Sequence, residues 1–392
     1  MGRGSHILTI NSGSSSIKFS LYILGATERL VLKGELGRIE LSQGFLEAFD
    51  HDGQKLAAQE LPLPDHEAAF KTLFDWLQGH EVGKDLDAVG HRLVHGGAAH
   101  IRPQLASPDL LADLQQLVPL APDHLPHEIK GLKAVQQLFP EVPQAVCFDT
   151  AFHRRMPKVA QRYALPAALA GEELLHYGFH GLSYEYLTQE LAREKVAYGK
   201  LIIAHLGNGA SMAAIEDGRS LDTTMGLTPT GGLVMSTRSG DLDPGVVLYL
   251  LQEKGLTPGA LNQMLNHQAG LLGISGISAD MQDLLAQAET QASAALAVEV
   301  FCYQARKFAG ALAAALGGLN TFVFTGGIGE NSPAIRARLC APLEFLGLRL
   351  DRKSNEKNAP LISTKDSAVA VRVMKTNEEL MIARHTRDLI RS

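Results

Sequence analysis

Apolar and polar positions near the start of the chain follow the short period of β-strands. His6–Ile10 is a compact, mostly apolar run, and Ile17–Leu24 alternates in part between apolar and polar residues. Both patterns predict strands. The turn between them, Asn11–Ser16, consists of Asn, Gly and Ser, whose side chains and backbone hydrogen-bond readily. This segment therefore predicts a strand, a polar turn and a second strand.

The same plan recurs in the second half of the chain. Leu201–Ala204 and Met212–Ile215 are apolar runs, and between them His205–Ser211 is a turn rich in Gly, Asn and Ser. Two strand–turn–strand units suggest an internal duplication in which one hairpin opens each half.

Helices are predicted from capping residues and prolines. Ser107, Asp243 and Thr257 each precede a proline, as an N-cap precedes the first helical position. The Ala-rich stretch Thr290–Leu316 predicts a long helix, and Phe322–Phe324 predicts a strand after it. Strands and helices that alternate in this way indicate an α/β fold, with ligands in a crevice between the halves.

Glycines gather in loops that leave short apolar strands. The chain has 38 of them without a regular period, so a collagen-like repeat is excluded. Besides the two turns above, the loops are Thr228–Gly240, Leu271–Ser275 and Thr325–Ser332. Loops of Gly, Ser, Thr and Asn let backbone N–H groups approach phosphate oxygens closely. Because no P-loop motif occurs and the dinucleotide fingerprint is weak, they predict a nucleotide cradle of another kind.

Composition narrows the class of protein. The 392 residues suggest two domains or one large one. A net charge of −6 without a basic cluster argues against nucleic-acid binding and against a polybasic membrane anchor. Cys147, Cys302 and Cys340 form no C-x-x-C pair, which argues against a disulfide framework and a zinc site. No signal peptide or spanning segment is recognisable, so we expect a soluble, cytoplasmic protein.

A series of motifs resembles the acetate kinase family. They are Asn11–Lys18, His91–Gly97, Phe148–His153, Gly178–Gly181, His205–Ser211, Thr237–Asp241, Thr325–Ser332 and Thr376–Glu379. The motifs stand in the family's order and cover essentially the whole chain. Propionate kinases share several of them, and butyrate kinases share them more weakly.

The resemblance implies a duplicated two-domain fold of the actin, Hsp70 and sugar-kinase type, which is ribonuclease H-like and has a central cleft. Residues 1–150 plus about 378–392 would form the acyl-substrate domain, and about 151–377 the nucleotide-binding domain. The implied reaction is direct, reversible, in-line transfer of the ATP γ-phosphate to acetate, giving acetyl phosphate and ADP. Mg²⁺ is the implied metal, for which Mn²⁺ can substitute, and a homodimer is the implied assembly.

The resemblance also implies roles for individual residues. The substrate-binding residues would be Arg92, Val94, Phe179 and Pro229. The catalytic residues would be Asp149, His180 and Arg238, and the metal ligands would be Asn11 and Glu378. The nucleotide-binding residues would be Lys18, His205, Leu206, Gly207, Asn208, Gly209, Asp280, Met281, Gln282, Gly327, Ile328, Gly329, Glu330 and Asn331.

The chemistry calls for positive charge more than for a base. An alkyl carboxylate has a pKa of roughly 4–5, so at neutral pH the acceptor is already a nucleophile. Catalysis then rests on neutralising charge and positioning two anions. An acid/base role has little to do on an ionised substrate, so we expect Asp149 to orient an arginine or a magnesium-bound water.

Two departures from the family leave the substrate open. Asp123 stands where the family has Leu in the acyl pocket, and Gln282 replaces an Arg beside adenine. A kinase for propionate or another short-chain carboxylate is therefore the alternative. A catalytically silent nucleotide-binding paralogue is a further alternative, which the intact set of charged site residues disfavours.

Overall fold

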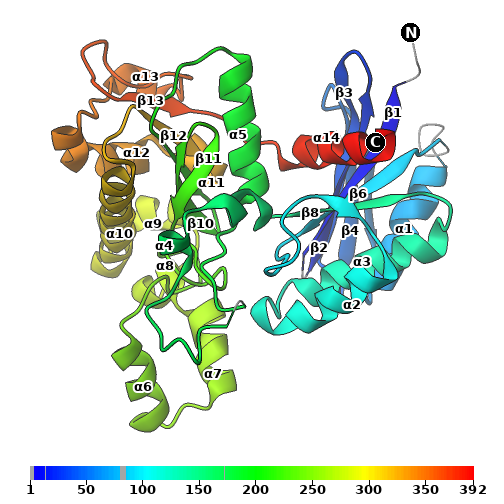
Figure 1. Ribbon diagram of the computed structural model, residues 1–392, viewed down its shortest axis with the longest axis horizontal. Coiled ribbons are helices and arrows are strands. Elements are labelled where there is room, and N and C mark those ends of the chain that lie inside the picture. The colour runs from blue at the N-terminus through cyan, green and yellow to red at the C-terminus, as the bar shows by residue number, and fades with distance from the viewer. Residues whose placement is uncertain (1–3, 14, 80–84, 172) are drawn as a thin grey trace. The chain divides into compact units, whose positions relative to one another are not determined.

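The computed structural model describes residues 4–13, 15–79, 85–171 and 173–392 (Figure 1). The chain divides into two compact units. Unit 1 comprises Met1–Phe152 and Asn377–Ser392, and unit 2 comprises His153–Thr376. We describe each unit by itself.

Unit 1 is built on an 8-stranded sheet. The strands, in sheet order, are β5 (Lys55–Leu61), β4 (Gly44–Asp50), β3 (Glu28–Gly37), β2 (Ser16–Leu24), β1 (Ser5–Ser12), β6 (Ala88–Leu93), β8 (Gln144–Phe148) and β7 (Gln104–Leu105). The first hairpin, β1–β2, is antiparallel as the polar turn predicted, whereas β6 pairs in parallel with both β1 and β8.

Helices cover both faces of this sheet. They are α1 (His66–Gln78), α2 (Pro108–Leu117), α3 (Leu125–Leu138) and α14 (Glu378–Arg391), with short 3₁₀ turns at Val118–Leu120 and Ala151–Arg155. Successive residues of a strand point to opposite faces. Accordingly Leu8 joins the core with Phe70 of α1, whereas Ile7 packs with Ala383 of α14 (Figure 1).

Unit 2 repeats the central sheet of unit 1. Its 5-stranded sheet has the order β11 (Arg219–Thr223), β10 (Ala210–Glu216), β9 (Leu201–Leu206), β12 (Thr321–Thr325) and β13 (Ala370–Val373). The hairpin β9–β10 and the strand β11 are antiparallel, and β12 lies parallel to β9 and β13. This order matches β3-β2-β1-β6-β8, so the predicted duplication and the α/β fold class are confirmed.

Many short helices and one long helix surround the second sheet. They are α4 (Lys158–Gln161), α5 (Gly181–Arg193), α6 (Pro244–Gln252), α7 (Pro258–Gln263), α8 (Gly270–Ser275), α9 (Met281–Gln287), α10 (Ala292–Leu316), α11 (Gly326–Asn331), α12 (Pro333–Cys340) and α13 (Arg352–Glu356). A π turn at Met264–Gln268 and a 3₁₀ turn at Ala341–Leu346 join them. No helix in the described part of the chain combines the length and the apolar character needed to cross a membrane.

The predicted helix starts are confirmed. Ser107, Asp243 and Thr257 each accept a hydrogen bond from a backbone N–H in the first turn of α2, α6 and α7. The long helix begins at Ala292, slightly later than predicted, and ends where Gly317 adopts a left-handed conformation.

Two of the predicted glycine loops are helical in the structure, so the prediction of loops was wrong there. Leu271–Ser275 lies within α8, and most of Thr325–Ser332 forms α11. The strand β12 passes into α11 at Gly326, whose φ is +78°. A Cβ there would lie 2.7 Å from the carbonyl oxygen of Leu206, so only glycine allows so abrupt a strand-to-helix turn.

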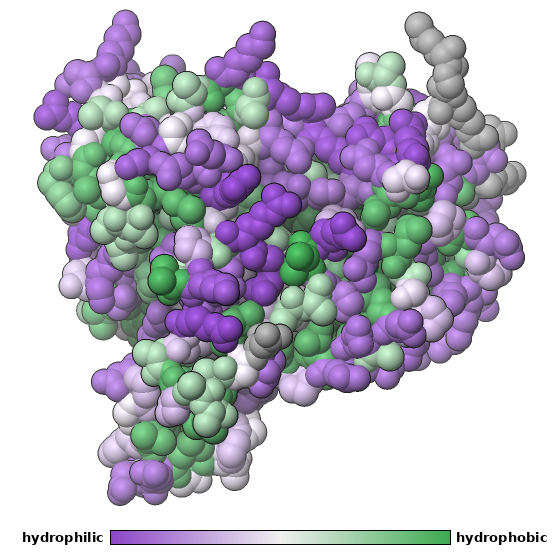
Figure 2. Space-filling model, viewed as in Figure 1, coloured by the Kyte–Doolittle hydropathy of each residue, from purple (hydrophilic) through white to green (hydrophobic). Residues whose placement is uncertain are grey.

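Helix α6 exposes an apolar surface. None of its residues is buried, and Val246, Leu248 and Tyr249 are each about half exposed. Figure 2 shows apolar side chains over this projecting part of unit 2. A monomer gains nothing from such a surface, because apolar area in water is unfavourable.

Candidate active site

Arg92 is the centre of a charged cluster in unit 1. Its Nη2 lies 2.5 Å from Oδ2 of Asp149, and its Nη1 donates to Oδ1 of Asn11 at 3.3 Å. Its Nε lies 3.7 Å from Oε2 of Glu378. One guanidinium thus contacts Asp149, which was predicted to orient an arginine or a magnesium-bound water, and both predicted metal ligands.

The sheet brings these residues together. Strands β1, β6 and β8 are parallel to one another, so their carboxyl ends meet at one edge of the sheet. Asn11 lies near the end of β1, Arg92 near the end of β6, and Asp149 directly after β8. Glu378 is the first residue of α14, which Asn377 caps by accepting the N–H of Leu380 at 2.9 Å.

Burial shifts the pKa values of the charged residues in this cluster. Asp149 is fully buried, and the side chain of Glu378 is 16% exposed. Burial, followed by the charge of Asp149, raises the pKa of Glu378 to about 8. Burial acts to lower the pKa of Arg92, but the nearby carboxylates outweigh it and raise the pKa, so this guanidinium stays charged.

The cluster fits a hard divalent cation. Asn11 and Glu378 offer amide and carboxylate oxygens, which Mg²⁺ prefers. Burial and the charge of Asp149 both disfavour the ionised form of Glu378, and a bound dication would favour it.

Glu128 is part of this cluster, although no motif pointed to it. Both of its carboxylate oxygens accept the backbone N–H of Val94, each at 3.1 Å. The side chain is buried on α3, and burial raises its pKa to about 8. The available signal was a single acidic residue among the apolar positions Leu125, Ile129 and Leu132 of a helix.

Lys18 lies opposite Asn11 in the β1–β2 hairpin. It is exposed, and its charge acts on Glu378. The structure therefore places this lysine on the same side of unit 1 as the cluster around Arg92.

In unit 2, two predicted catalytic residues meet over a glycine. His180 has a left-handed backbone with φ 57° just before α5, and its Nδ1 lies 2.8 Å from Oγ of Ser211. A Cβ on Gly209 would lie 3.4 Å from Nε2 of His180 and 3.5 Å from Nη1 of Arg238. A side chain at position 209 would therefore contact both residues.

Hydrogen bonds hold the loop that carries Arg238 next to Gly209 and His180. Nη1 of Arg238 donates to the carbonyl of Pro229 at 3.1 Å. The N–H of Ser236 donates to the carbonyl of Asn208 at 3.2 Å. The ring of His205 stacks on that of His180, with centroids 4.2 Å apart.

Two glycine turns of unit 2 lie side by side. Strands β9 and β12 are parallel, with Thr325 opposite His205, so both strands end at the same edge. A Cβ on Gly207 would lie 3.8 Å from the backbone N of Gly327. Close backbone approach of this kind suits phosphate binding by N–H groups.

Other predicted nucleotide-binding residues use their polar side chains to bind nearby backbone groups. The carboxylate of Glu330 accepts from the N–H of Gly326 at 3.0 Å, and the amide of Asn331 donates to the carbonyl of Gly327 at 3.0 Å. Asp280 caps α9 by accepting the N–H of Gln282 at 2.6 Å. These polar side chains support the loops and the helix directly.

Several predicted residues contribute apolar surface or backbone only. Leu206, Met281, Phe179 and Val94 are buried, and Ile328 is partly buried. Gly329 is buried as well, whereas Gln282 is exposed.

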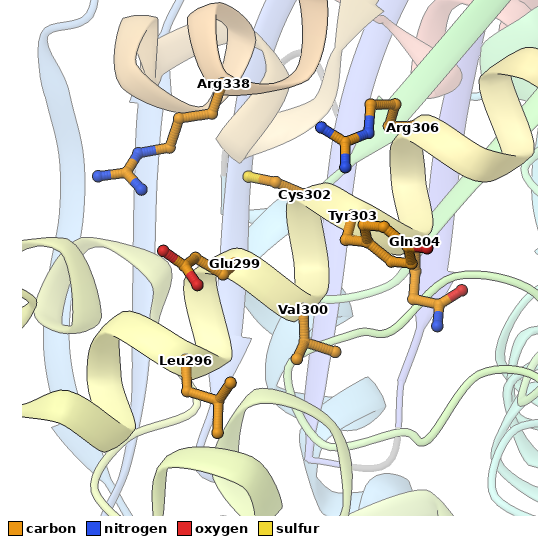
Figure 3. A pocket seen from close by; sticks show the side chains of 8 residues that line it. All are labelled: Leu296, Glu299, Val300, Cys302, Tyr303, Gln304, Arg306 and Arg338. Carbon is orange, nitrogen blue, oxygen red and sulfur yellow. The ribbon is translucent and has the colours of Figure 1, made fainter. Parts of the chain in front are cut away.

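A pocket on α10 lies apart from these groups. It is lined by Leu296, Glu299, Val300, Cys302, Tyr303, Gln304, Arg306 and Arg338 (Figure 3). No predicted site residue is among them. Burial raises the pKa of the Cys302 thiol to about 11, so it is not a nucleophile at neutral pH.

Comparisons with known proteins match the chain along nearly its whole length. The profile of the Acetokinase family matches residues 6–384. An acetate kinase of Nitrobacter hamburgensis is 45% identical over 98% of this chain and 96% of its own. An acetate kinase of Rhizobium meliloti is 46% identical over 98% of both chains.

Solved structures show the same similarity. The acetate kinase of Porphyromonas gingivalis superimposes with a TM-score of 0.89 at 37% identity, covering 98% of this chain and 100% of that one. A propionate kinase of Francisella tularensis superimposes with a TM-score of 0.93 at 38% identity and the same coverage. The matched length includes both units.

Proposed function

Because this chain belongs to the acetokinase family, we propose that it transfers the γ-phosphate of ATP reversibly to acetate with the help of Mg²⁺. The predicted family, the phosphotransferase class with a carboxyl acceptor and the acetate kinase function are confirmed by the matches. The observation that carries the residue-level proposal is the arginine cluster of unit 1, in which Arg92 holds Asp149, Asn11 and Glu378.

Arg92 is the proposed anchor for the acceptor carboxylate. A guanidinium presents a planar fork that matches a carboxylate. Its pair with buried Asp149 fixes the plane of that fork, which supports an orienting role for Asp149 rather than proton transfer. The acceptor itself needs no base, because it is ionised at neutral pH.

Asn11 and Glu378 are the proposed metal ligands. A bound divalent ion would neutralise charge on the transferring phosphoryl group. Mn²⁺, which also accepts oxygen ligands, is expected to substitute. Lys18, across the hairpin from Asn11, adds a mobile positive charge for ATP phosphate.

The glycine turns of unit 2 are the proposed nucleotide site. Their adjoining backbones at Gly207 and Gly327 support phosphate or ribose contacts, and Gly209 leaves room beside His180 and Arg238. These two side chains would stabilise the charge of the transition state. We therefore assign acyl-substrate binding to unit 1 and nucleotide binding to unit 2.

A homodimer in the cytoplasm is the proposed biological form. The exposed apolar residues of α6 support association with a second copy. ATP is an intracellular substrate, which supports the cytoplasmic location.

Formation of an acyl phosphate tests the proposed function. The purified protein is incubated with ATP, Mg²⁺ and a panel of short carboxylates, and the product is trapped with hydroxylamine. We expect hydroxamate from acetate that depends on both ATP and the metal. Absence of hydroxamate from every acid would contradict the proposal and favour a silent nucleotide-binding paralogue.

Asp123 is expected to decide between acetate and other acids. A carboxylate in an apolar acyl pocket repels an anionic acceptor, so Asp123→Leu should lower the KM for acetate several-fold with little change in kcat. Steady-state kinetics with acetate and propionate measures the effect. Asp52→Leu, which removes a charge 78% exposed, is the control. An unchanged or higher KM for acetate in Asp123→Leu would place residue 123 outside the pocket.

A further inference from the structure

Three possible metal ligands that the proposed reaction does not use converge in unit 1. They are Glu40, His66 and His127, whose ligand atoms all lie within 4.8 Å of one another. His66 is the first residue of α1 and is buried, His127 lies in the first turn of α3, and Glu40 lies in the turn after β3. Three segments distant in sequence thus bring a carboxylate and two imidazoles together.

The hydrogen bonding of His66 points one lone pair into this group. Its Nε2 lies 2.8 Å from the carbonyl oxygen of Gly13, which can only accept, so Nε2 donates. Its Nδ1 is buried, has no hydrogen-bond partner and lies 3.6 Å from Oε1 of Glu40. In the neutral tautomer this nitrogen directs a lone pair at a carboxylate, so the geometry calls for a cation between the two atoms, either a proton or a metal ion.

This is the arrangement of a histidine that binds a metal. Metal-binding histidines donate their second ring N–H to a backbone carbonyl or a carboxylate, which fixes the tautomer and the ring. The carbonyl of Gly13 does this for His66.

His127 offers a second nitrogen. Its ring lies 4.5 Å from that of His66 between centroids, and its Nδ1 is also buried without a hydrogen-bond partner. A neutral imidazole can offer this nitrogen to a metal ion.

We propose that Glu40, His66 and His127 bind a transition-metal dication of the Zn²⁺ class, with a fourth position for water. Two histidines and one glutamate are a known zinc ligand set, at Zn–N and Zn–O distances of about 2.0–2.2 Å. The exposed side chain of Glu40 can close the remaining distance. Mg²⁺ does not compete well here, because it prefers six oxygen ligands.

No cysteine takes part, so the cysteine spacing, which argued against a zinc site, could not reveal this one. The ligands come from a turn and from the starts of two helices.

The site is bonded to the polar turn between β1 and β2. His66 holds the carbonyl of Gly13, and Oγ of Ser12 donates to the carbonyl of His127 at 3.5 Å. The N–H of Ile39, next to Glu40, donates to the carbonyl of Ser15 at 3.0 Å. A metal ion that pulls the three ligands together would therefore hold this turn, and we expect Zn²⁺ to inhibit phosphoryl transfer. Only this inhibition rests on the proposed function.

Calorimetry on chelator-treated full-length protein tests the binding. Zn²⁺ is titrated in excess Mg²⁺, which occupies oxygen-rich sites, and Co²⁺ is titrated in parallel to record the visible spectrum of a tetrahedral site. We expect one Zn²⁺ per chain and at least a tenfold loss of affinity in His127→Gln and in Glu40→Gln. Melting temperatures verify that both variants are folded.

His51→Gln is the matched control. His51 is exposed and belongs to the group Asp50-His51-Asp52, another possible ligand group in the described residues. We expect wild-type affinity in this variant. No saturable binding in the wild type, or affinity unchanged in both His127→Gln and Glu40→Gln, or affinity lost in His51→Gln, would overturn the site.

Inhibition of hydroxamate formation by Zn²⁺ is a separate test from the calorimetry. At a Zn²⁺ concentration that fills the site, hydroxamate formation should fall in the wild type and persist in His127→Gln. Equal inhibition of both proteins would overturn the coupling to the β1–β2 turn. If the wild type forms no acyl phosphate even without Zn²⁺, the proposed function fails, and calorimetry alone decides the metal site.

Discussion

Replacing Arg92 with lysine is expected to lower kcat/KM for acetate by about 100-fold or more while the protein stays folded. Arginine contacts Asp149, Asn11 and Glu378 in three different directions from one rigid plane. Lysine keeps the positive charge but offers a single flexible ammonium group, so it cannot present a fork to the acceptor while it pairs with Asp149. The loss should appear in both KM for acetate and kcat.

Three measurements on Arg92→Lys separate the effect of side-chain geometry from that of positive charge, which lysine keeps. Hydroxamate kinetics gives kcat and KM, ADP binding is followed by calorimetry, and the melting temperature reports folding. ADP affinity should stay near the wild-type value, because Arg92 is not among the proposed nucleotide-binding residues and lysine keeps its positive charge.

Arg387→Lys in α14 is the control, because Arg387 pairs with the exposed Asp388 and surface pairs contribute little. Near-normal kcat/KM in Arg92→Lys would contradict the anchoring role. Arg92→Ala is expected to be less stable by about 3–5 kcal/mol, since it leaves buried carboxylates without their partner.

The sequence was sufficient where local chemistry decides structure. Ser107, Asp243 and Thr257 cap helices because a capping side chain and a following proline act within a single turn. The two hairpins were likewise predictable, because a short polar turn between apolar runs leaves few other arrangements.

It was insufficient where the outcome depends on distant partners. The change from loop to helix at α11 depends on the close approach of Gly326 to Leu206, which is 120 positions earlier in the chain. Glu128 was missed for the same reason, because its partner Val94 lies on another element.

Glu128 leads to the second large expected effect, which concerns stability. Burial raises the pKa of Glu128 to about 8, from 4.5 in the unfolded chain. The folded protein therefore binds a proton that the unfolded chain has released, and this stabilisation is complete below about pH 4.5 and is lost as the pH rises towards 8. Such a shift corresponds to a loss of about 5 kcal/mol over that range.

Glu128→Gln should remove this dependence. Glutamine has the same shape, keeps an acceptor oxygen for the N–H of Val94 and carries no charge. The variant should match the wild type near pH 5 and be more stable at pH 8, where the wild type must bury a carboxylate. Glu128→Leu leaves the buried N–H of Val94 without an acceptor and should lose about 1–3 kcal/mol even at pH 5.

Denaturant unfolding between pH 5 and pH 8, without added metal, measures both variants against the wild type. The free energy of unfolding of the wild type is subtracted from that of each variant at every pH, because other groups also titrate. Burial lowers the pKa of His91 to about 4 and of His153 to about 3, so these groups destabilise the fold as the pH falls below 6.5. Glu378 titrates like Glu128 and contributes to the wild type and to both variants alike. The pH-dependent difference between Glu128→Gln and the wild type therefore isolates one carboxyl group. Parallel curves would show that Glu128 is ionised throughout, and that Arg92, rather than a proton, neutralises it.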